Sequence, residues 1–421
     1  MDSNKKTNTV KQKVKKILKK DNKRKPKAKF LGFKLFEVIV LISLATIIGV
    51  FSGSFFTYLF MNNRVPKVNS SKYIDEFEEA FNNVIDKYYE KVDKSELIDA
   101  AINGMLSELD DYTSYMTPEQ TKSFNERMEG EYKGIGIEFI TTALNEHFVT
   151  GVFEDTPAQK AGIKVGDQIV KVDNLNVSQL TGDGIANYIK GENIKKVDVT
   201  VKRGDKEITL TIDKTVVTLP SIIKKSFESN GKKIGYIGVS LFANNTYNQF
   251  KKALNELENE KVSSLIIDLR DNSGGYLHVT ENMLELFMKK GSPLYQTKEK
   301  NVTKTYYDET TEKRDIPVAL LINQGSASAS EVLASAFKEV YKAEIIGKTS
   351  FGKGTVQQPK EISNGGMLKI TTSEWLTALG NTINKVGVKP TIEVEIGNDY
   401  LNNPSDENDM QLQKAIEILS K

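Results

Sequence analysis

The sequence predicts a multidomain α+β protein, in which an apolar anchor and a helical segment precede a β-rich module and an α/β core. Three observations support this fold class: a charge-free apolar run near the start, alternating apolar residues between glycine turns in the middle, and strands that alternate with helices toward the end. At 421 residues the chain is long enough for two or three folded domains. The expected parts are a basic segment 1–37, a transmembrane helix 38–61, a linker 62–72, a helical domain 73–127, a β-rich domain 128–218, an α/β core 219–400 and a C-terminal helix 401–421.

The first element is the apolar run Val38 to Met61, which is 24 residues long and carries no charge. A run of roughly 20 such residues spans a bilayer. Residues 1–36 carry 14 Lys and Arg but only two Asp. Because basic flanks stay on the cytoplasmic side, we expect a single-pass cell-membrane protein with its N-terminus in the cytoplasm and its body outside.

A cleaved signal peptide has the same order of charge and apolar residues and is the alternative to an anchor. This apolar run exceeds a typical signal-peptide core. The following segment, Asn62-Asn63-Arg64-Val65-Pro66, offers no Ala-x-Ala cleavage pattern. We therefore expect the chain to stay attached to the membrane through residues 38–61.

Composition narrows the chemistry of the body. Cysteine is absent, which excludes a thiol nucleophile, disulfides and cysteine-ligated zinc. The only histidines are His147 and His278, and no metal-ligand spacing is evident, so we expect neither a metal nor another cofactor. Beyond residue 36 the chain carries 44 basic and 54 acidic residues. A mildly acidic body argues against a nucleic-acid-binding domain.

The helical segment, Tyr73 to about Arg127, contains two apolar stripes at helical spacing. The first comprises Ile74, Phe77, Ala80, Phe81, Val84 and Ile85, and the second Ile98, Ala101, Ile102, Met105 and Leu109. Between helices lies the turn-rich Asp110-Asp111-Tyr112-Thr113-Ser114-Tyr115-Met116. We expect packing and turn formation to be the role of this stretch.

The β-rich module begins with a glycine turn before a strand, Tyr132-Lys133-Gly134-Ile135-Gly136-Ile137-Glu138-Phe139. By itself, such a turn is more often only a turn. Together with Thr156–Ala158, Ala161–Ile163, Val165–Val172 and the hairpin from Val197, it resembles a PDZ domain. The resemblance implies that Gly134, Ile135, Gly136 and Ile137 present backbone N–H groups to a terminal carboxylate, and that the peptide adds as a strand. The two isoleucines would favour apolar tails.

The core alternates strands with amphipathic helices, which predicts a mainly parallel sheet covered by helices. The expected strands are 234–239, 263–269 and 318–322, and the expected helices are 245–260 and 280–288. The loop Gly325-Ser326-Ala327-Ser328-Ala329-Ser330-Glu331 follows the last strand and precedes another helix.

A serine at this turn needs a base to take its proton before it can attack a carbonyl. Histidine is scarce, but Lys353, in Phe351-Gly352-Lys353-Gly354, can serve if its surroundings keep it neutral. Its pKa would have to fall by roughly two to three units from about 10.4. Residue chemistry alone does not choose among Ser326, Ser328 and Ser330.

The motif Gly-Ser-Ala-Ser-Ala-Ser-Glu followed by Phe-Gly-Lys-Gly resembles the carboxyl-terminal processing (tail-specific) serine proteases, and the likeness extends over nearly all of residues 73–420. It implies a crotonase-like sheet in the core, Ser328 as nucleophile, Lys353 as general base and Gln357 as the group that orients the lysine. It further implies peptide or protein substrates with free, apolar C-termini, and oligomerisation as a homodimer through the terminal helices. The Asp-x-Tyr-Thr element at Asp110 also resembles this family.

An attacking serine also needs backbone donors for the oxyanion that it creates. The Ala329 N–H, at the start of a helix, is one natural donor. The second should come from Asp271-Asn272-Ser273-Gly274-Gly275, where the resemblance indicates Gly274 first and Gly275 second. Ser273 stands where the family usually has proline.

Other interpretations of the same residues remain. Ser328-x-x-Glu331 is also a capping box, which needs no enzyme. A catalytically silent PDZ adaptor would bind tails without cleaving them, and a hydratase or acyl-transfer enzyme would use a related core. We interpret the sequence as a membrane-anchored serine endopeptidase that recognises C-terminal tails.

Overall fold

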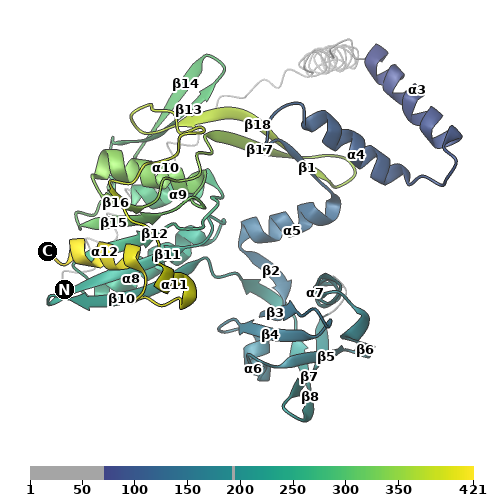
Figure 1. Ribbon diagram of the computed structural model, residues 1–421, viewed down its shortest axis with the longest axis horizontal. Helices are drawn as coiled ribbons and strands as arrows, with labels where there is room; N and C mark the ends of the chain where they lie inside the picture. Colours follow the sequence, from purple (N-terminus) through teal and green to yellow (C-terminus); the bar gives the residue numbers. More distant parts are fainter. Residues whose placement is uncertain (1–70, 192–194) are drawn as a thin grey trace, which may run out of the picture. The chain divides into compact units, whose positions relative to one another are not determined.

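The computed structural model describes residues 71–191 and 195–421 (Figure 1). The predicted basic segment, transmembrane helix and most of the linker therefore lie outside the described residues. Within the described ranges, no helix combines the length and the apolar character needed to cross a bilayer. The described residues divide between Val92 and Asp93 into two units, and each unit is described by itself below.

The described part of the first unit is the helix α3, Ser71–Lys87. Its length agrees with the predicted helical periodicity. Several large apolar side chains of this helix are exposed, namely Tyr73, Ile74, Phe77 and Val84. Ile74, Phe77 and Val84 belong to the predicted apolar stripe, and at one helical face they recur every three to seven residues.

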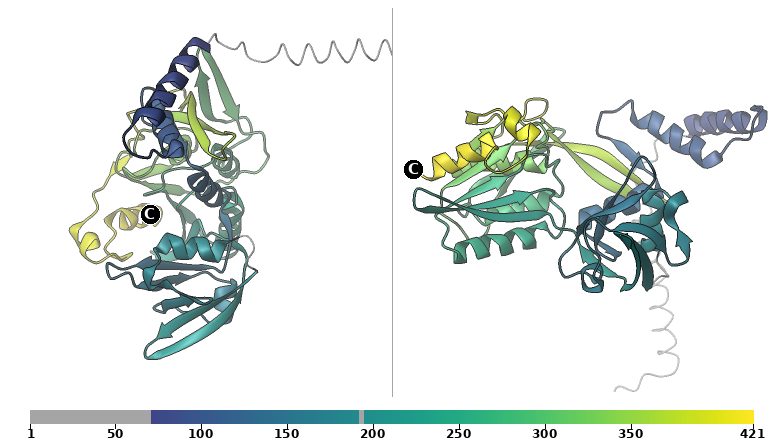
Figure 2. Two further views of the ribbon diagram at one scale, coloured as in Figure 1. Left: turned by 90° about the vertical axis from the view of Figure 1, so that its right-hand side faces the viewer. Right: turned by 60° about the horizontal axis from the view of Figure 1, so that its bottom comes forward.

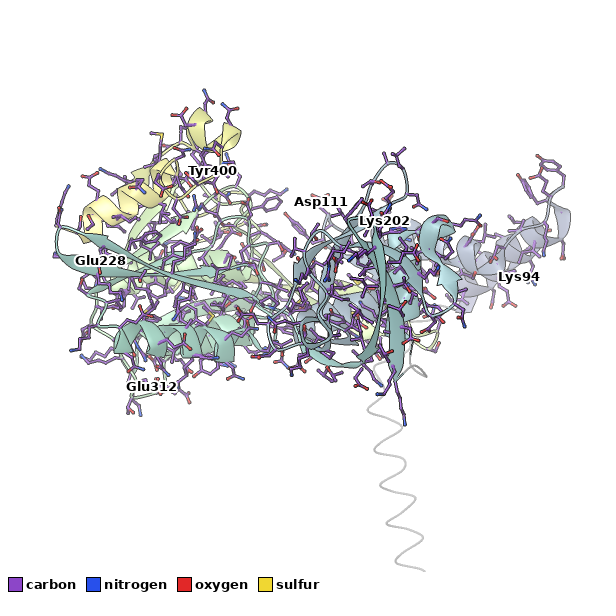
Figure 3. The ribbon with its side chains drawn as sticks, turned by 90° about the horizontal axis from the view of Figure 1, so that it is seen from below. Lys94, Asp111, Lys202, Glu228, Glu312 and Tyr400 are labelled. Atoms are coloured by element: carbon purple, nitrogen blue, oxygen red, sulfur yellow. The ribbon has the colours of Figure 1, made fainter. Side chains whose placement is uncertain are left out.

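The second unit opens with two helices, α4 at Lys94–Leu106 and α5 at Pro118–Glu129. A capping box of Thr117 and Gln120 starts α5, and Gly130 ends it in the left-handed conformation. Between them, the predicted turn-rich stretch contains the short strand β1, Ser114–Met116. This strand pairs antiparallel with a strand some 250 residues later, with Ser114 opposite Lys369. Asp111, in the turn before β1, is labelled in Figure 3.

The β-rich module is built as predicted, from short antiparallel strands around its own apolar core. Its main sheet has the order β3-β4-β5-β7-β8, so β3 is an edge strand, and β6 pairs with β5. A two-stranded ribbon of β2 and β9 lies beside it in the chain. The bounds are β2 Glu131–Gly134, β3 Ile137–Thr141, β4 His147–Val152, α6 Pro157–Ala161, β5 Gln168–Val172, β6 Leu175–Asn176, α7 Gly182–Lys190, β7 Lys196–Arg203, β8 Lys206–Asp213 and β9 Thr215–Thr218.

The α/β core contains a six-stranded sheet in the order β10-β11-β12-β15-β16-β19. All neighbours from β11 onward are parallel, while β10 is antiparallel to β11. The bounds are β10 Ile222–Ser229, β11 Lys232–Val239, β12 Ser264–Asp268, β15 Val318–Ile322, β16 Glu344–Gly347 and β19 Ile392–Glu393. In the side-chain view, Glu228 marks β10 at the edge of this sheet (Figure 3). The mainly parallel sheet agrees with the prediction.

Helices cover both faces of this sheet (Figures 1 and 2). Because side chains alternate along a strand, Ile267 faces the helices α8, α9 and α10, whereas Ile266 faces α12. Both β12 and β15 are buried along their whole length. The helices are α8 Thr246–Asn259, α9 Leu277–Glu285, α10 Ala329–Ala336, α11 Asn398–Asn402 and α12 Met410–Leu419.

A second sheet, which the sequence analysis did not anticipate, brings the helical segment and the core together. Its order is β1-β18-β13-β14, and β17 pairs with β18. The strands are β13 Pro293–Glu299, β14 Val302–Tyr307, β17 Thr355–Glu361 and β18 Met367–Leu376. β17 begins two residues after Lys353, so this sheet carries the chain that follows the predicted base.

Candidate active site

Ser328 occupies a sharp turn between β15 and α10. It is the N-cap of α10 and has φ +54° and ψ −116°, a conformation that non-glycine residues rarely adopt. Strain of this kind persists where the surrounding fold imposes it, and it is typical of nucleophiles on strand-to-helix turns. The buried strand before the turn and the buried helix after it hold the backbone in place.

The two serines that flank Ser328 have structural roles. Ser326 is fully buried and its hydroxyl donates to the carbonyl of Leu269 at 2.8 Å. Ser330 is also fully buried, and its hydroxyl donates to the carbonyl of Asn272 at 2.8 Å. Ser328 is half-buried and lines a pocket. Among these three serines, the geometry therefore favours Ser328 as the reactive one.

This pocket has a volume of about 440 Å³ and collects the predicted site residues of the core. Ser328, Lys353, Gln357, Gly274 and Ala329 all line it, although they come from three separate segments of the chain. Apolar side chains make up much of the remaining wall, including Met116, Phe124, Met128, Leu241, Tyr276, Leu277, Val332, Val356 and Trp375.

Glu331 connects the turn of Ser328 to the loop of Lys353. Its carboxylate is fully buried and accepts four hydrogen bonds. One oxygen accepts the N–H groups of Ser328 at 2.8 Å and Lys353 at 2.9 Å. The other accepts the hydroxyl of Ser350 at 2.6 Å and the N–H of Gly352 at 2.7 Å. Burial raises the pKa of this carboxyl, against the opposing effect of its four donors.

Glu331 therefore caps the helix, as the capping-box interpretation of the sequence predicted, since it accepts the N–H of Ser328. The same carboxylate also fixes the backbone of the proposed base. Helix capping and assembly of the site are thus the work of one side chain, and they do not exclude each other.

Lys353 is half-buried, and its backbone is held by Trp375, whose indole N–H donates to the Lys353 carbonyl at 2.8 Å. Its amine lies 4.9 Å from the ring centroid of Tyr112, in the turn before β1. Burial, followed by the positive charge of Lys369, lowers the pKa of Lys353, while Asp110 and Glu331 act in the opposite direction. The direction is the one that a general base at neutral pH requires.

The amine of Lys353 is in the same pocket as Ser328, but no hydrogen bond joins it to the Ser328 hydroxyl in the part of the chain that the structure describes. Catalytic hydrogen bonds are often long before substrate binds and shorten only in the complex. The four-carbon stem of lysine leaves its amine free to reorient within the pocket.

Gln357 lies on β17 and contacts threonines rather than Lys353. Its side-chain nitrogen donates to the hydroxyls of Thr355 at 2.9 Å and Thr371 at 3.2 Å. Thr371 in turn donates to a carboxylate oxygen of Asp110 at 3.1 Å. Burial alone would raise the pKa of Asp110, but hydrogen bonds from Thr113 and its neighbours outweigh it and lower that pKa. The Asp-x-Tyr-Thr element is thus part of the site and not only a turn.

The predicted oxyanion loop packs directly against the serine turn. Gly274 has φ +107°, and a Cβ placed on it would lie 3.0 Å from the Cβ of Ser328, so a side chain there would collide with the nucleophile turn. The N–H of Gly274 donates to the side-chain oxygen of Asn272 at 2.9 Å. The N–H of Ala329 has no hydrogen-bond partner among residues 71–191 and 195–421. Ala329 thus offers a ready donor, whereas that of Gly274 is shared with Asn272.

Asn272 was not singled out in the sequence. It is fully buried, its side-chain nitrogen donates to the carbonyl of Val239 at 2.8 Å, and its own carbonyl accepts the N–H of Ala327 at 3.0 Å. It therefore ties the glycine loop to the serine loop. In the sequence, the signal for this role was an asparagine directly after an apolar strand. An Asn-Ser-Gly-Gly stretch indicates an ordinary turn equally well.

A second pocket, of about 710 Å³, lies along the edge strand β3 of the β-rich module. Ile135 and Ile137 line it, with Phe139 of β3 and Ala186 and Ile189 of α7. The two predicted glycines flank Ile135 in the chain. Gly136 has φ +92°, and a Cβ there would lie 2.4 Å from Thr156. A free sheet edge beside an apolar groove is what strand addition of a peptide requires.

Within the described residues, no cluster of three or more His, Asp or Glu side chains has a geometry that could hold a metal ion.

Several segments of the chain match known protein families. Residues 233–394 match peptidase family S41, residues 148–203 match the PDZ domain, and residues 59–120 match the N-terminal domain of the activating protease CtpB. The chain is 36% identical over 328 residues to the carboxy-terminal processing protease CtpB of Bacillus subtilis (strain 168), which covers 77% of this chain and 68% of that protein.

It is also 33% identical over 344 residues to a probable CtpA-like serine protease of Staphylococcus aureus (strain N315), covering 80% of this chain and 68% of that protein. Among solved structures, the photosystem II D1 C-terminal processing protease aligns at 25% identity with a TM-score of 0.45, over 80% of this chain and 98% of that one. The chain therefore belongs to the carboxyl-terminal processing proteases of peptidase family S41 and is a serine-type peptidase that carries a PDZ domain.

Proposed function

We propose that the protein is a membrane-anchored serine endopeptidase that binds the free C-terminal tails of proteins through its PDZ groove and cleaves them with Ser328 and Lys353. One observation supports this most directly. A strained, half-buried Ser328 shares a pocket with a half-buried lysine that has no carboxylate within ion-pair distance in the described part of the chain. A lysine in these surroundings is suited to lose its proton.

In the proposed reaction, the neutral amine of Lys353 takes the proton of the Ser328 hydroxyl as its oxygen attacks the peptide carbonyl. The N–H of Ala329 stabilises the resulting oxyanion, and the N–H of Gly274 joins it once its hydrogen bond to Asn272 is released. The Lys353 ammonium then returns the proton to the leaving amine, which leaves an acyl group on the Ser328 oxygen. Lys353 next takes a proton from a water molecule that attacks this ester, and it returns the proton to the Ser328 oxygen as the acid product leaves. Gln357 orients the lysine, because its side-chain oxygen stays available once its nitrogen donates to Thr355 and Thr371.

The proposed grip on the substrate uses the pocket along β3. The backbone of Gly134, Ile135, Gly136 and Ile137 would bind the terminal carboxylate, and the tail would pair with the free edge of β3. The apolar wall of the groove supports a preference for apolar C-terminal residues. No metal or organic cofactor enters the scheme.

The test compares the purified full-length protein with its Ser328→Ala variant on peptides that end in apolar residues, each with a free or an amidated terminus. We expect the variant to lose at least about a thousandfold in kcat/KM, and the amidated peptides to be cleaved more slowly by the active protein. Equal cleavage by both proteins would refute Ser328 as nucleophile. Equal cleavage of both peptide forms would refute the carboxylate grip.

The second candidate, a PDZ adaptor without catalysis, makes the opposite forecast for the same assay. The bond from Gly274 N–H to Asn272 is the observation that favours it, because this amide is not free for an oxyanion. An adaptor would bind the free-acid peptides and not the amidated ones, with no turnover of either by the unaltered protein.

A further inference from the structure

The active-site pocket contains a second lysine, Lys369, whose position on β18 is set by strand register. Lys369 pairs with Ser114 of β1 on one side and with Pro359 of β17 on the other. Two residues further along, Thr371 pairs with Gln357. Because side chains two residues apart on a strand share a face, Lys369 lies on the same face as the Gln357 network. Both lysines and Gln357 line the pocket of Ser328.

Each of the two lysines lies against an aromatic ring and not against a carboxylate. The amine of Lys369 is 5.2 Å from the ring centroid of Phe124, and that of Lys353 is 4.9 Å from the ring centroid of Tyr112. Both side chains are half-buried. Across the described ranges, neither amine forms an ion pair. An ammonium on an aromatic face keeps a favourable contact without being neutralised.

Two amines in one apolar pocket of about 440 Å³ cannot both stay charged without a penalty. Arg127 lines the same pocket and adds to the positive potential, while Asp110 and Glu331 reduce it. Both carboxylates are already engaged, with Asp110 accepting from Thr113 and Thr371 and Glu331 from its four donors. Burial lowers the pKa of Lys369, and burial together with Lys369 lowers the pKa of Lys353.

We propose that Lys369 is a positioning residue for the reaction at Ser328, whose ammonium on the face of Phe124 disfavours a second charge in the pocket and thereby leaves Lys353 unprotonated. The inference rests on the proposed function, because it assigns to Lys369 an effect on the pKa of Lys353, the base that takes the proton of Ser328. Lys369 itself transfers no proton. Since the two amines interact, they titrate as a pair, and removal of one charge must shift the pKa that the other displays.

The kinetic test is the pH profile of kcat/KM, which reports the free enzyme. Activity should rise with pH as Lys353 loses its proton. In Lys369→Met, whose unbranched side chain is one atom shorter and carries no charge, we expect the acidic limb to move to higher pH by about one unit. The rate near neutral pH then falls about tenfold and recovers in alkaline buffer.

Two variants are matched controls for this profile. Lys369→Arg keeps the charge and should retain the profile of the unaltered protein. Lys360→Met makes the same charge change at an exposed position of β17, opposite Leu368, and should also leave the profile unchanged. A loss of alkaline recovery in Lys369→Met, or a thermal midpoint below the assay temperature, would identify a structural role and overturn the proposal.

A second measurement needs no turnover and therefore separates this proposal from the proposed function. In a Ser328→Ala background, Lys353 is acetylated by trace acetic anhydride across a pH series, and its modified peptide is quantified by mass spectrometry. The apparent pKa of Lys353 should be higher when Lys369 is Met. An unchanged pKa overturns the role of Lys369 even if Ser328 proves to be the nucleophile. A raised pKa of Lys353 supports that role even if Ser328 proves not to be the nucleophile.

The remaining outcome concerns substrate contact. If Lys369→Met leaves the acidic limb in place but raises KM only for peptides with acidic residues near the cleavage point, Lys369 binds substrate and does not tune the base. That result would overturn the proposal.

Discussion

At the scale of single residues, the site depends on a buried carboxylate that is not itself part of the proposed chemistry. Glu331 holds the backbone of Ser328 and of Lys353 on the same oxygen. These two residues are 25 positions apart, and a backbone hydrogen bond from the Phe351 N–H to the Ser326 carbonyl, at 2.9 Å, also joins their loops. A buried carboxylate with several donors stabilises the loops that supply those donors. Loss of any one of these hydrogen bonds is costly, because it leaves a buried polar group without a partner.

Glu331→Gln tests this device. The amide keeps one oxygen but places an NH2 group against N–H and O–H donors, so two of the four hydrogen bonds are lost. We expect the free energy of unfolding to fall by about 1–3 kcal/mol and kcat to fall with it, as measured by urea denaturation and peptide cleavage. Glu361→Gln, at an exposed position of β17, is the control and should change neither. Unaltered stability in Glu331→Gln would show that the buried carboxylate is not what holds the two loops.

At the scale of elements, the strand pair β17–β18 organises one wall of the pocket. Its register places Thr371 opposite Gln357, and the Thr371 hydroxyl both accepts from Gln357 and donates to Asp110. The adjacent Thr372 is the extra residue where the register shifts between the pairs Gln357–Thr371 and Val356–Ser373, and its buried hydroxyl has no hydrogen-bond partner among the described residues. Of these two neighbouring threonines, Thr371 is thus hydrogen-bonded to the site through its hydroxyl and Thr372 is not.

Thr371→Val should weaken catalysis because it removes both hydrogen bonds while keeping the side-chain shape. We expect kcat/KM to fall severalfold, in line with about 1 kcal/mol for a lost hydrogen bond. Thr372→Val replaces an unpaired buried hydroxyl by a methyl group and should leave kcat/KM unchanged and stability equal or higher. Equal losses in both variants would mean that strand packing, and not the Gln357 network, sets the rate.

The groove along β3 allows a second test at this scale. Gly136→Ala forces a Cβ to within 2.4 Å of Thr156, so the loop before β3 must shift. Gly166→Ala has a similar φ, +89°, but its Cβ would meet no atom within 4 Å. We expect the first variant to bind a fluorescent peptide with a free apolar terminus at least tenfold more weakly than the second, by anisotropy. Equal affinity would place the tail elsewhere.

At the scale of the whole molecule, the basic start, the apolar run 38–61 and the mildly acidic body suggest an anchored enzyme that works outside the cytoplasm. This placement remains a proposal, since the run lies outside the described residues. The family matches the body of the chain and leaves the location of the protein open.

Protease protection of intact spheroplasts tests the proposed topology. With tags at both ends, external proteinase should remove the C-terminal tag and spare the N-terminal one until detergent is added. Survival of the C-terminal tag would contradict the proposal that the residues after the apolar run lie outside the cytoplasm. A mature chain that has lost its first 60 or so residues, by intact mass, would favour the cleaved signal peptide instead.

Much of this organisation could be predicted from the sequence because it is encoded locally. The parallel core follows from short apolar strands between amphipathic helices, and the β-rich module from its glycine turns. Ser328, Lys353, Gln357 and Gly274 were indicated by the family resemblance, which is carried by motifs of a few residues each. The structure brings them into one pocket, while their catalytic roles remain predictions.

What the sequence analysis missed depends on contacts between distant segments. The pairing of Ser114 with Lys369 joins positions about 250 residues apart, and nothing in either local pattern announces it. The roles of Asn272, Tyr112 and Lys369 arise only when separate loops and strands meet around the pocket. From the sequence, a single lysine on a strand is expected to be a solvated side chain. Only the strand register shows that Lys369 lies on the same face as the residues of the pocket.

By itself, then, the sequence determined the family, because its motifs are written in contiguous residues, and the resemblance carried by those motifs indicated the candidate nucleophile and base. Only the tertiary structure decided which serine faces the pocket, that a buried glutamate couples the two loops, and that a second lysine lies beside the first. The physical reason is that protonation and hydrogen bonding depend on burial and on charges a few ångströms away, and those neighbours come from segments that only folding brings together.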